Sequence, residues 1–340
     1  MLIRSKAPLR IGLAGGGTDV SPYSDLFGGA ILNATIDLYA YATLEPLNNG
    51  KIEFCIDGTD RCLMMDSVQE IPLQQDYELF IGVYNRVVKQ FGLSPLSFRL
   101  TSYIEAPQGS GLGTSSTIVV SLLGAFVEWL NLPLGKYDIA HLAYEIERID
   151  LNLAGGKQDQ YAATFGGINF LEFLGNDKVI VNPLNLKSKI VNELELNLLL
   201  YFTATQRESA RIITDQVKNV EQKNTQAIEA MHNLKAQALQ MKDHLIRGEL
   251  AKMGEILRFG WENKKRMAQS ISNLTIDEIY EAALNAGASG GKISGAGGGG
   301  FMFFFCPGVT KISVAKSIER FGGKVQPFKF TSQGLTTWTI

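Results

Sequence analysis

The stretch APQGSGLGTSST, residues 106–117, decides how the fold of this chain is interpreted. Three glycines at alternate positions, Gly109, Gly111 and Gly113, lead into four hydroxyl residues and then into an apolar segment typical of a helix. A glycine loop that opens a helix presents unpaired backbone N–H groups and the positive end of the helix dipole. The pattern therefore indicates an anion site with phosphate as the obvious ligand; a ligand-free turn capped by Ser115 is the alternative.

The residues of this loop exclude two familiar phosphate-binding motifs. A Walker loop has a lysine directly before its Ser or Thr, whereas Gly113 is followed by Thr114 and no lysine lies nearby. A dinucleotide-binding loop has a glycine where Thr114 stands. The later cluster at 295–300 fits the string G-x-G-x-x-G, but it leads into the strand-like residues 301–305 instead of a helix, so it does not predict a dinucleotide site either.

The composition favours a small-molecule partner. The chain has 340 residues, enough for two domains that share a cleft, and 45% of its residues are apolar. Its net charge is -2, and no stripe of Lys and Arg with interleaved aromatic residues is present. Neither a nucleic acid nor a membrane is therefore an expected partner. The sequence leaves the oligomeric state open between monomer and homodimer.

Cysteine usage and apolar runs indicate a cytoplasmic protein. Cys55, Cys62 and Cys306 lack metal-ligand spacing, and the first residues show no secretory signal pattern. The apolar run at 117–130 is too short to cross a bilayer and contains Glu128. We therefore expect a core helix there and the cytoplasm as the compartment.

The alternation of strand and helix patterns predicts an α+β fold with a change of domain around 176–191. The long tract at 208–269 is rich in Lys, Glu and Gln and is interpreted as the solvated face of a helical bundle. The predicted strands are 30–44, 51–56, 96–104, 301–306 and 326–331, with a strand-like region at 179–200. The other predicted helices are 115–130, 136–150, 276–285 and 309–321.

Three further motifs accompany the glycine loop. The N-terminal SKAPLRIGLAGGGTDVSPY, residues 5–23, surrounds a triple glycine with Lys6, Arg10 and Asp19. The segment YEIERIDLNLAGGKQDQY, residues 144–161, places one acid on a helix and another after a glycine-rich bend. The third motif is KISGAGGGG, residues 292–300. Each has a purely structural alternative, respectively a β-turn, a solvated acid with a loop aspartate, and a flexible hairpin.

In this order the motifs resemble those of the GHMP kinase superfamily over nearly the whole chain. The resemblance implies an N-terminal domain of the ribosomal-protein-S5 type at 1–183 and a ferredoxin-like C-terminal domain at 184–340, with ATP and the acceptor between them. It also implies that the glycine loop holds the ATP phosphates. The residues expected at these phosphates are Gly109, Ser110, Gly111, Leu112, Gly113, Thr114 and Ser115.

The resemblance extends to the residues that carry out phosphoryl transfer. It implies that Ser115 and Glu147 bind Mg²⁺, with Thr114 or Ser116 as alternatives to Ser115. Asp159 matches the catalytic base, which accepts or orients the proton of the acceptor hydroxyl. Arg10 matches an active-site arginine that offsets charge in the transition state, and Lys6 is a weaker candidate. A non-catalytic regulator is disfavoured because it would not need all of these groups.

The sugar kinases of the superfamily are the most similar members. Galactokinases carry Gly-Glu-His-Thr-Asp where this chain has residues 15–19, and loss of the two bulky side chains would widen the sugar pocket. The implied reaction is phosphorylation of the anomeric hydroxyl of a heptose 7-phosphate, with fucose or galactose as alternative acceptors. Arg211 is a further candidate for a distal phosphate. The residues expected to contact the acceptor are Gly16, Gly17, Thr18, Asp19, Lys157, Arg207, Gly297 and Gly298.

Overall fold

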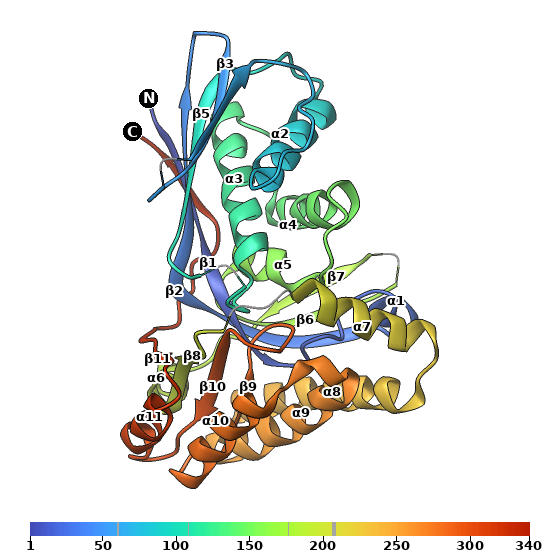
Figure 1. The fold of residues 1–340 in the computed structure, drawn as a ribbon, viewed down its shortest axis with the longest axis vertical. Coiled ribbons are helices and arrows are strands. Elements are labelled where there is room, and N and C mark those ends of the chain that lie inside the picture. Colours follow the sequence, from blue (N-terminus) through green and yellow to red (C-terminus); the bar gives the residue numbers. More distant parts are fainter. Residues whose placement is uncertain (60, 108, 176, 206–208) are drawn as a thin grey trace.

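Two β-sheets with helices packed on them form the molecule (Figure 1). The computed structural model describes residues 1–59, 61–107, 109–175, 177–205 and 209–340. The first sheet has eight strands in the order β12-β1-β2-β5-β3-β4, with β6 paired to β2 and β7 paired to β6. Its strands are β1 Ile3–Ala14, β2 Gly29–Pro46, β3 Lys51–Ile56, β4 Cys62–Asp66, β5 Phe98–Ile104, β6 Ile168–Phe173, β7 Val179–Pro183 and β12 Thr336–Thr339.

One face of the first sheet is covered by helices from the same half of the chain (Figure 1). The helix α3 is buried along most of its length, since Val119, Leu122 and Phe126 pack into the core formed with Phe98 of β5. An apolar helix of this kind is stabilised by burial on several sides and not by a single amphipathic stripe. These helices are α1 Tyr23–Phe27, α2 Glu78–Phe91, α3 Thr114–Leu130, α4 Lys136–Glu145, the π-helix η1 Ile146–Asp150 and α5 Gln158–Phe165.

The second sheet is antiparallel, in the order β11-β8-β10-β9. Its strand β10 is buried throughout and reads FMFFF, the unbroken apolar run expected of a strand covered on both faces. The strands are β8 Leu198–Phe202, β9 Gly290–Ile293, β10 Phe301–Phe305 and β11 Lys324–Val325. The helices are α6 Ser188–Asn197, α7 Ser209–Glu221, α8 Thr225–Arg247, η2 Leu250–Lys252, α9 Met253–Met267, η3 Gln269–Ile271, α10 Leu274–Asn285 and α11 Lys311–Glu319.

The long strands β1 and β2 connect the two halves of the molecule. Leu9 and Ile11 of β1 belong to the same buried cluster as Met241 of α8, Leu257 of α9 and Phe303 of β10. The last strand, β12, returns to the first sheet and pairs antiparallel with β1, so the two chain ends lie side by side (Figure 1). The boundary at 183/184 stays a prediction, but the C-terminal tail is not confined to the second unit as that division assumed.

The predicted strands 30–44, 51–56, 96–104 and 301–306 and the predicted helices are confirmed with small shifts at their ends. The strands β1, β4, β6, β9 and β12 and the helices α1 and α5 were not predicted, and four further points need correction. The helix α2, residues 78–91, was missed, and the region 179–200 contains the helix α6 between two strands. The predicted strand 326–331 is reduced to the single bridge of Phe330 with Ile36. The tract at 208–269 is not a solvated face, because α7, α8 and α9 each bury several of their side chains. Charged residues elsewhere on these helices concealed this in the sequence.

The cysteines are not all free. Cys55 and Cys62 face each other across the β3–β4 hairpin and form a disulfide, whereas Cys306 is free and buried. No helix among the described residues has the length and apolar character needed to cross a membrane.

Candidate functional site

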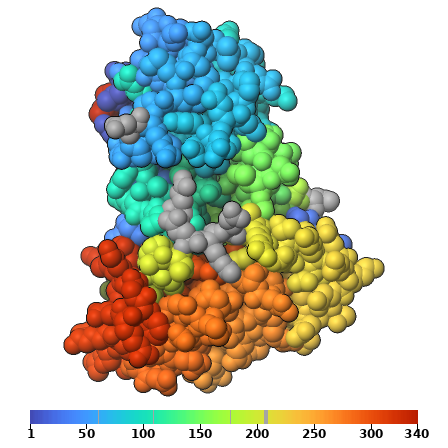
Figure 2. Space-filling view, in the orientation of Figure 1, coloured from blue at the N-terminus to red at the C-terminus, as the bar shows by residue number. Residues whose placement is uncertain are grey.

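A cavity of about 290 Å³ lies between the two units that the space-filling view shows as an upper and a lower lobe (Figure 2). Its wall combines the glycine loop, the N-terminal motif and the start of α5 with residues of α7 and α9. The polar or charged side chains that line it are Arg10, Asp19, Thr114, Ser115, Ser116, Glu147, Arg148, Gln158, Asp159, Ser209, Gln216 and Lys264. Of the predicted ATP residues, Gly109, Gly111, Gly113, Thr114 and Ser115 line this cavity, as do Glu147, Asp159 and Arg10, whereas Ser110 and Leu112 are buried and do not line it.

The glycine loop forms one wall of the cavity. Gly109, Gly111 and Gly113 all have positive φ, between 70° and 80°. A side chain at Gly111 would begin 2.4 Å from the carbonyl oxygen of Ser294, so the close approach of the C-terminal motif also requires glycine. The first turn of α3 has no side-chain cap, which corrects the alternative of a turn capped by Ser115. Its free N–H groups suit an anion.

Asp159 lies beside this loop and is held by Arg10. Arg10 Nε donates a hydrogen bond of 2.6 Å to Asp159 Oδ1, and its Nη1 donates to the carbonyl oxygen of Gly111, also at 2.6 Å. The guanidinium is buried, whereas the Asp159 side chain is 21% exposed toward the cavity. One side chain therefore fixes both the carboxylate and the loop, as a planar donor fork permits.

Glu147 is fully buried, and the π-helix η1 presents it at the cavity wall. Its Oε2 accepts a hydrogen bond of 2.5 Å from Gln160 Nε2, while its Oε1 has no hydrogen-bond partner among the described residues. Burial raises the pKa of this carboxyl, although the Arg148 guanidinium, 3.5 Å from Oε1, opposes the shift. An unsatisfied buried carboxylate oxygen of this kind is a fitting ligand for a cation.

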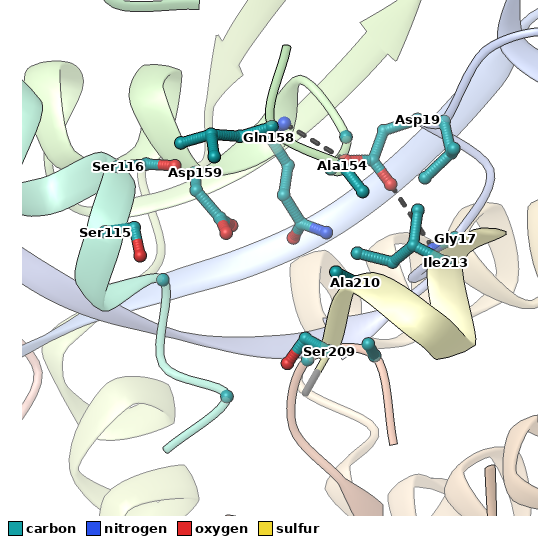
Figure 3. Close-up of a pocket in the computed structure, with 18 of the residues that line it drawn as sticks. Gly17, Asp19, Ser115, Ser116, Ala154, Gln158, Asp159, Ser209, Ala210 and Ile213 are labelled. Atoms are coloured by element: carbon teal, nitrogen blue, oxygen red, sulfur yellow. Dashed lines mark hydrogen bonds between the residues drawn. The ribbon is translucent and has the colours of Figure 1, made fainter. Parts of the chain in front are cut away.

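Ser115 and Ser116 have different surroundings. Ser115 is exposed at the cavity wall, whereas Ser116 is buried and accepts a hydrogen bond of 3.1 Å from the Gln160 amide that also holds Glu147. Figure 3 shows both serines on the side of the cavity where Asp159 lies. The shared amide links Ser116 to Glu147, so the alternative ligand Ser116 fits a joint cation site better than Ser115.

Asp19 marks the opposite side of the cavity, near Gly17 (Figure 3). The buried carboxylate accepts hydrogen bonds from the backbone N–H groups of Gly17, at 3.3 Å, and Gln158, at 3.1 Å. Burial raises its pKa, and the neighbouring Asp159 carboxylate adds to the shift. Asp19 thus ties the triple glycine to the start of α5, the helix that carries Asp159.

Several predicted acceptor contacts lie elsewhere. Lys157 is buried between Asp25, at 3.0 Å, and Asp177, at 2.7 Å, so its charge is already neutralised. Thr18 bonds to backbone carbonyls of the triple-glycine loop and β2. Gly297 and Gly298 pack against Ile271 and do not line the cavity.

Two of the remaining predicted cations, Lys6 and Arg211, do not lie at the cavity. Lys6 lies over the Tyr39 ring at 4.7 Å, and Arg211 is exposed on α7. Arg207 lies outside the described residues. Neither Lys6 nor Arg211 is part of the cavity wall.

Two lysines near the site were not foreseen. Lys264 of α9 and Lys292 of β9 are both buried, and their ammonium groups donate to the carbonyl oxygens of Gly16 and Gly12. Lys264 also lines the cavity. The sequence carried no signal for Lys264, because the lysine-rich segment around it resembles an exposed helix face.

Comparison with known proteins identifies the class. The model of the GHMP kinases N terminal domain matches residues 78–167, and that of the GHMP kinases C terminal domain matches residues 241–323. The chain belongs to the GHMP kinase family, which confirms the predicted two-domain kinase fold. It is a phosphotransferase with an alcohol group as acceptor, and ATP is the substrate that the family uses.

Individual relatives narrow the comparison. The chain is 47% identical over 338 residues to the D-glycero-alpha-D-manno-heptose 7-phosphate kinase of Campylobacter jejuni, covering 99% of each chain. A crystal structure of a D-glycero-D-manno-heptose 1-phosphate kinase from Bacteriodes thetaiotaomicron is also 47% identical, with a TM-score of 0.85 and 99% coverage of both chains. Galactose-bound galactokinase of Lactococcus lactis shares the fold, with a TM-score of 0.79 at 16% identity and coverage of 98% of this chain and 95% of that one.

Proposed function

We propose that this kinase transfers the terminal phosphoryl group of ATP to the anomeric hydroxyl of D-glycero-α-D-manno-heptose 7-phosphate, giving the 1,7-bisphosphate. The name of the Campylobacter jejuni relative supports this acceptor. The Bacteriodes thetaiotaomicron relative is named for the same heptose but for the 1-phosphate. The two names agree on the sugar, and the position of the new phosphate is left to experiment.

One observation carries the proposal: Asp159 lies directly beside the glycine loop and accepts a hydrogen bond from Arg10. A side chain at Gly113 would begin 3.1 Å from Asp159 Cγ, so the carboxylate and the first turn of α3 border the same space. An acceptor hydroxyl bonded to Asp159 would therefore face a phosphoryl group held by the loop. Positioning and charge neutralisation are what phosphoryl transfer chiefly requires of the protein.

The roles of the residues follow from this arrangement. Asp159 orients the hydroxyl and accepts its proton as the new bond forms. Arg10 keeps the carboxylate in place and adds positive charge next to the reacting groups. The backbone N–H groups of residues 109–115 hold the nucleotide phosphates. Asp19, opposite them, fixes the start of α5 and borders the space for the sugar.

The residues present also fit a magnesium ion. Glu147 Oε1, which has no hydrogen-bond partner among the described residues, and the hydroxyl of Ser116 or Ser115 are hard oxygen ligands. No group of three His, Cys, Asp or Glu side chains suited to a metal occurs in the described part of the chain, so phosphate and water oxygens would complete the shell. When bound, Mg²⁺ neutralises charge on the nucleotide phosphates.

A panel of acceptors tests the proposal. Purified protein with ATP and Mg²⁺ is assayed for ATP consumption with the heptose 7-phosphate, the heptose 1-phosphate, the free heptose, fucose and galactose. We expect the fastest turnover with the heptose 7-phosphate and a product with phosphates at positions 1 and 7. Preference for fucose or galactose, or no sugar-dependent ATP consumption, would reject the proposed acceptor.

A cytoplasmic location belongs to the same proposal. Use of ATP supports it, because ATP is made and kept inside the cell. The disulfide between Cys55 and Cys62 points the other way, since such bonds are rare in reducing compartments. Labelling of free thiols in freshly lysed cells distinguishes the two: reduced cysteines agree with a cytoplasmic enzyme, and a fully formed disulfide speaks against it.

A further inference from the structure

Lys264 is a buried positive charge that lacks an anionic partner. It ranks among the largest fully buried side chains of the molecule, with 1% of its surface exposed. Its ammonium group donates one hydrogen bond, of 3.3 Å, to the carbonyl oxygen of Gly16. No carboxylate lies within ion-pair distance of it in the part of the chain that the structure describes. A buried charge destabilises the folded protein unless it is paired, so a bound anion would stabilise this group.

A second buried lysine borders the same space. Lys292 is also buried, its ammonium donates to the carbonyl oxygen of Gly12 at 2.9 Å, and it has no ion-pair partner among the described residues. A side chain added at Gly16 would begin 3.7 Å from Lys264 Nζ and 3.8 Å from Lys292 Nζ. The two ammonium groups therefore border one space next to the triple glycine.

The charged groups around the pair do not neutralise it. Asp19 and Arg10 are the charged side chains that act on Lys264: the Asp19 carboxylate raises the pKa of Lys264, and the Arg10 guanidinium lowers it. Asp19 is itself engaged with two backbone N–H groups, and Arg10 is bonded to Asp159. Burial lowers the pKa of Lys264 to about 8 and lowers that of Lys292 as well, so both groups gain strongly from an added negative charge.

The position of Lys264 favours the acceptor over the nucleotide. Lys264 lines the cavity and contacts the triple-glycine loop, on the side marked by Gly17 and Asp19, whereas the serines of the phosphate loop lie on the other side (Figure 3). Asp159 lies on the side of the serines and lines the cavity. An acceptor that offers its hydroxyl to Asp159 extends from there toward Gly16 and Lys264.

We infer that Lys264, supported by Lys292, binds the phosphate group of the acceptor sugar. This is the phosphate at the end of the sugar distant from the reacting hydroxyl. The inference rests on the proposed function, and it makes the negative charge of this phosphate the feature by which the enzyme recognises the acceptor. A phosphate offers several oxygens to these donors and supplies the missing anion. Gly16 leaves the space beside the two ammonium groups open, so the enzyme would distinguish a phosphorylated from an unphosphorylated sugar at this point.

Removal of the charge tests the inference. In Lys264→Met the neutral side chain fills the same space, and Lys265→Met removes the exposed neighbour, whose ammonium lies 3.5 Å from Asp277, as the matched control. Affinity for the heptose 7-phosphate, measured by calorimetry without ATP, is expected to fall roughly 10- to 100-fold in Lys264→Met, as for the loss of a hydrogen bond to a charged group. Lys265→Met should bind like the wild type.

A second variant guards against misfolding of the first. Gly16→Asp places a carboxylate beside both ammonium groups, and a side chain at this position meets no atom closer than 3.7 Å. It should therefore fold, raise the melting temperature of the free protein and exclude the sugar phosphate. Affinity for ATP should change less than threefold in either variant, about the size of the deviation from additivity for distant, independent sites.

The outcomes separate the two proposals. Wild-type affinity for the heptose 7-phosphate in both Lys264→Met and Gly16→Asp would overturn the lysine site even if the kinase assay succeeds. A selective loss of ATP affinity would assign the lysines to the nucleotide instead and overturn it equally. Should the wild type phosphorylate no sugar phosphate, binding of inorganic phosphate is compared: loss in Lys264→Met supports an anion site there, and no loss, or no binding by the wild type, contradicts it.

Discussion

At the scale of single residues, the site contains several buried charged groups, and only some of them have a partner of opposite charge. Arg10 and Asp159 neutralise each other, whereas among the described residues Glu147 Oε1 accepts no hydrogen bond and Lys264 has no ion-pair partner. Unpaired buried groups destabilise the free protein but provide affinity when a ligand of opposite charge arrives. Each of them therefore predicts a distinct response to substitution.

Glu147 is expected to set the requirement for magnesium. Glu147→Gln keeps the size of the side chain and one oxygen but removes the negative charge, so the Mg²⁺ concentration for half-maximal activity should rise about tenfold or more. Steady-state rates at several Mg²⁺ concentrations measure this, with circular dichroism to verify the fold. An unchanged Mg²⁺ dependence would remove Glu147 from the metal site.

Lys264 predicts a pH dependence of stability. Burial lowers its folded-state pKa to about 8 from the usual lysine value of 10.5, so between these values the unfolded chain binds more protons and stability rises with pH. Below pH 8 the wild type carries the whole penalty, which amounts to about 3 kcal/mol at 1.36 kcal/mol per pKa unit. Lys264→Met lacks this dependence.

Urea denaturation of both proteins between pH 7 and 10.5 measures the effect. We expect Lys264→Met to be the more stable protein at pH 7 and its advantage to shrink as the pH approaches 10.5. A constant difference between the two proteins across this range would show that Lys264 does not carry a strained buried charge.

At the scale of elements, the phosphate loop depends on how closely other segments approach it. Gly111 has a φ of 79° and lies against the carbonyl of Ser294 in the loop after β9. Glycine is required here both for the backbone angle and for the contact. The strand-to-loop junction of the second sheet thus supports the wall of a site that belongs mainly to the first.

Gly111→Ala should therefore impair ATP binding more than its backbone strain explains. Gly92→Ala is the matched control, because Gly92 has a φ of 60° but no atom within 4 Å of an added side chain. The control should cost about 1 kcal/mol of stability and leave ATP affinity unchanged. Gly111→Ala should weaken ATP affinity at least about tenfold, as expected for the loss of one hydrogen bond between the loop and the ATP phosphates. Equal ATP affinities by titration would contradict the packing argument.

The sequence predicted this loop, its neighbours and most elements, because their signals are local. Alternation, helical periodicity and glycine spacing are properties of short stretches, and they located β3 and α3. The roles expected of Arg10 and Asp159 came from the resemblance to the kinase family. The helix α2 was missed because it follows a stretch with strand patterns, and the burial of Lys264 depends on contacts with a loop that precedes it by 248 residues. No local pattern carries that information.

At the scale of the whole molecule, β1 connects the first sheet with the C-terminal strand and with the helices and strands of the second unit. It pairs with β2 along one edge and with the C-terminal strand β12 along the other, and it carries Arg10 into the cavity. The tail therefore completes the sheet on which Arg10 lies, although it follows the second unit in the chain.

Removal of residues 336–340 should lower stability with little effect on the chemistry. The truncation deletes the pairing of β12 with residues 3–6 and the 2.7 Å hydrogen bond from Thr337 to Glu128, which lie away from Arg10. A loss of about 1–3 kcal/mol is expected from denaturant titration, while kcat at low temperature stays close to that of the full chain. An unchanged unfolding midpoint would show that β12 adds nothing to the sheet.

The most direct test of the account is transfer of phosphate in the presence and absence of the Asp159 carboxylate. ATP, Mg²⁺ and heptose 7-phosphate are followed by ³¹P NMR with the wild type and with Asp159→Asn, which keeps the hydrogen bond to Arg10 but cannot accept a proton. We predict a new anomeric phosphate signal with the wild type, and a kcat about 10²-fold lower in the variant with both ligands still bound. Near-wild-type formation of the same product by Asp159→Asn would contradict the central claim.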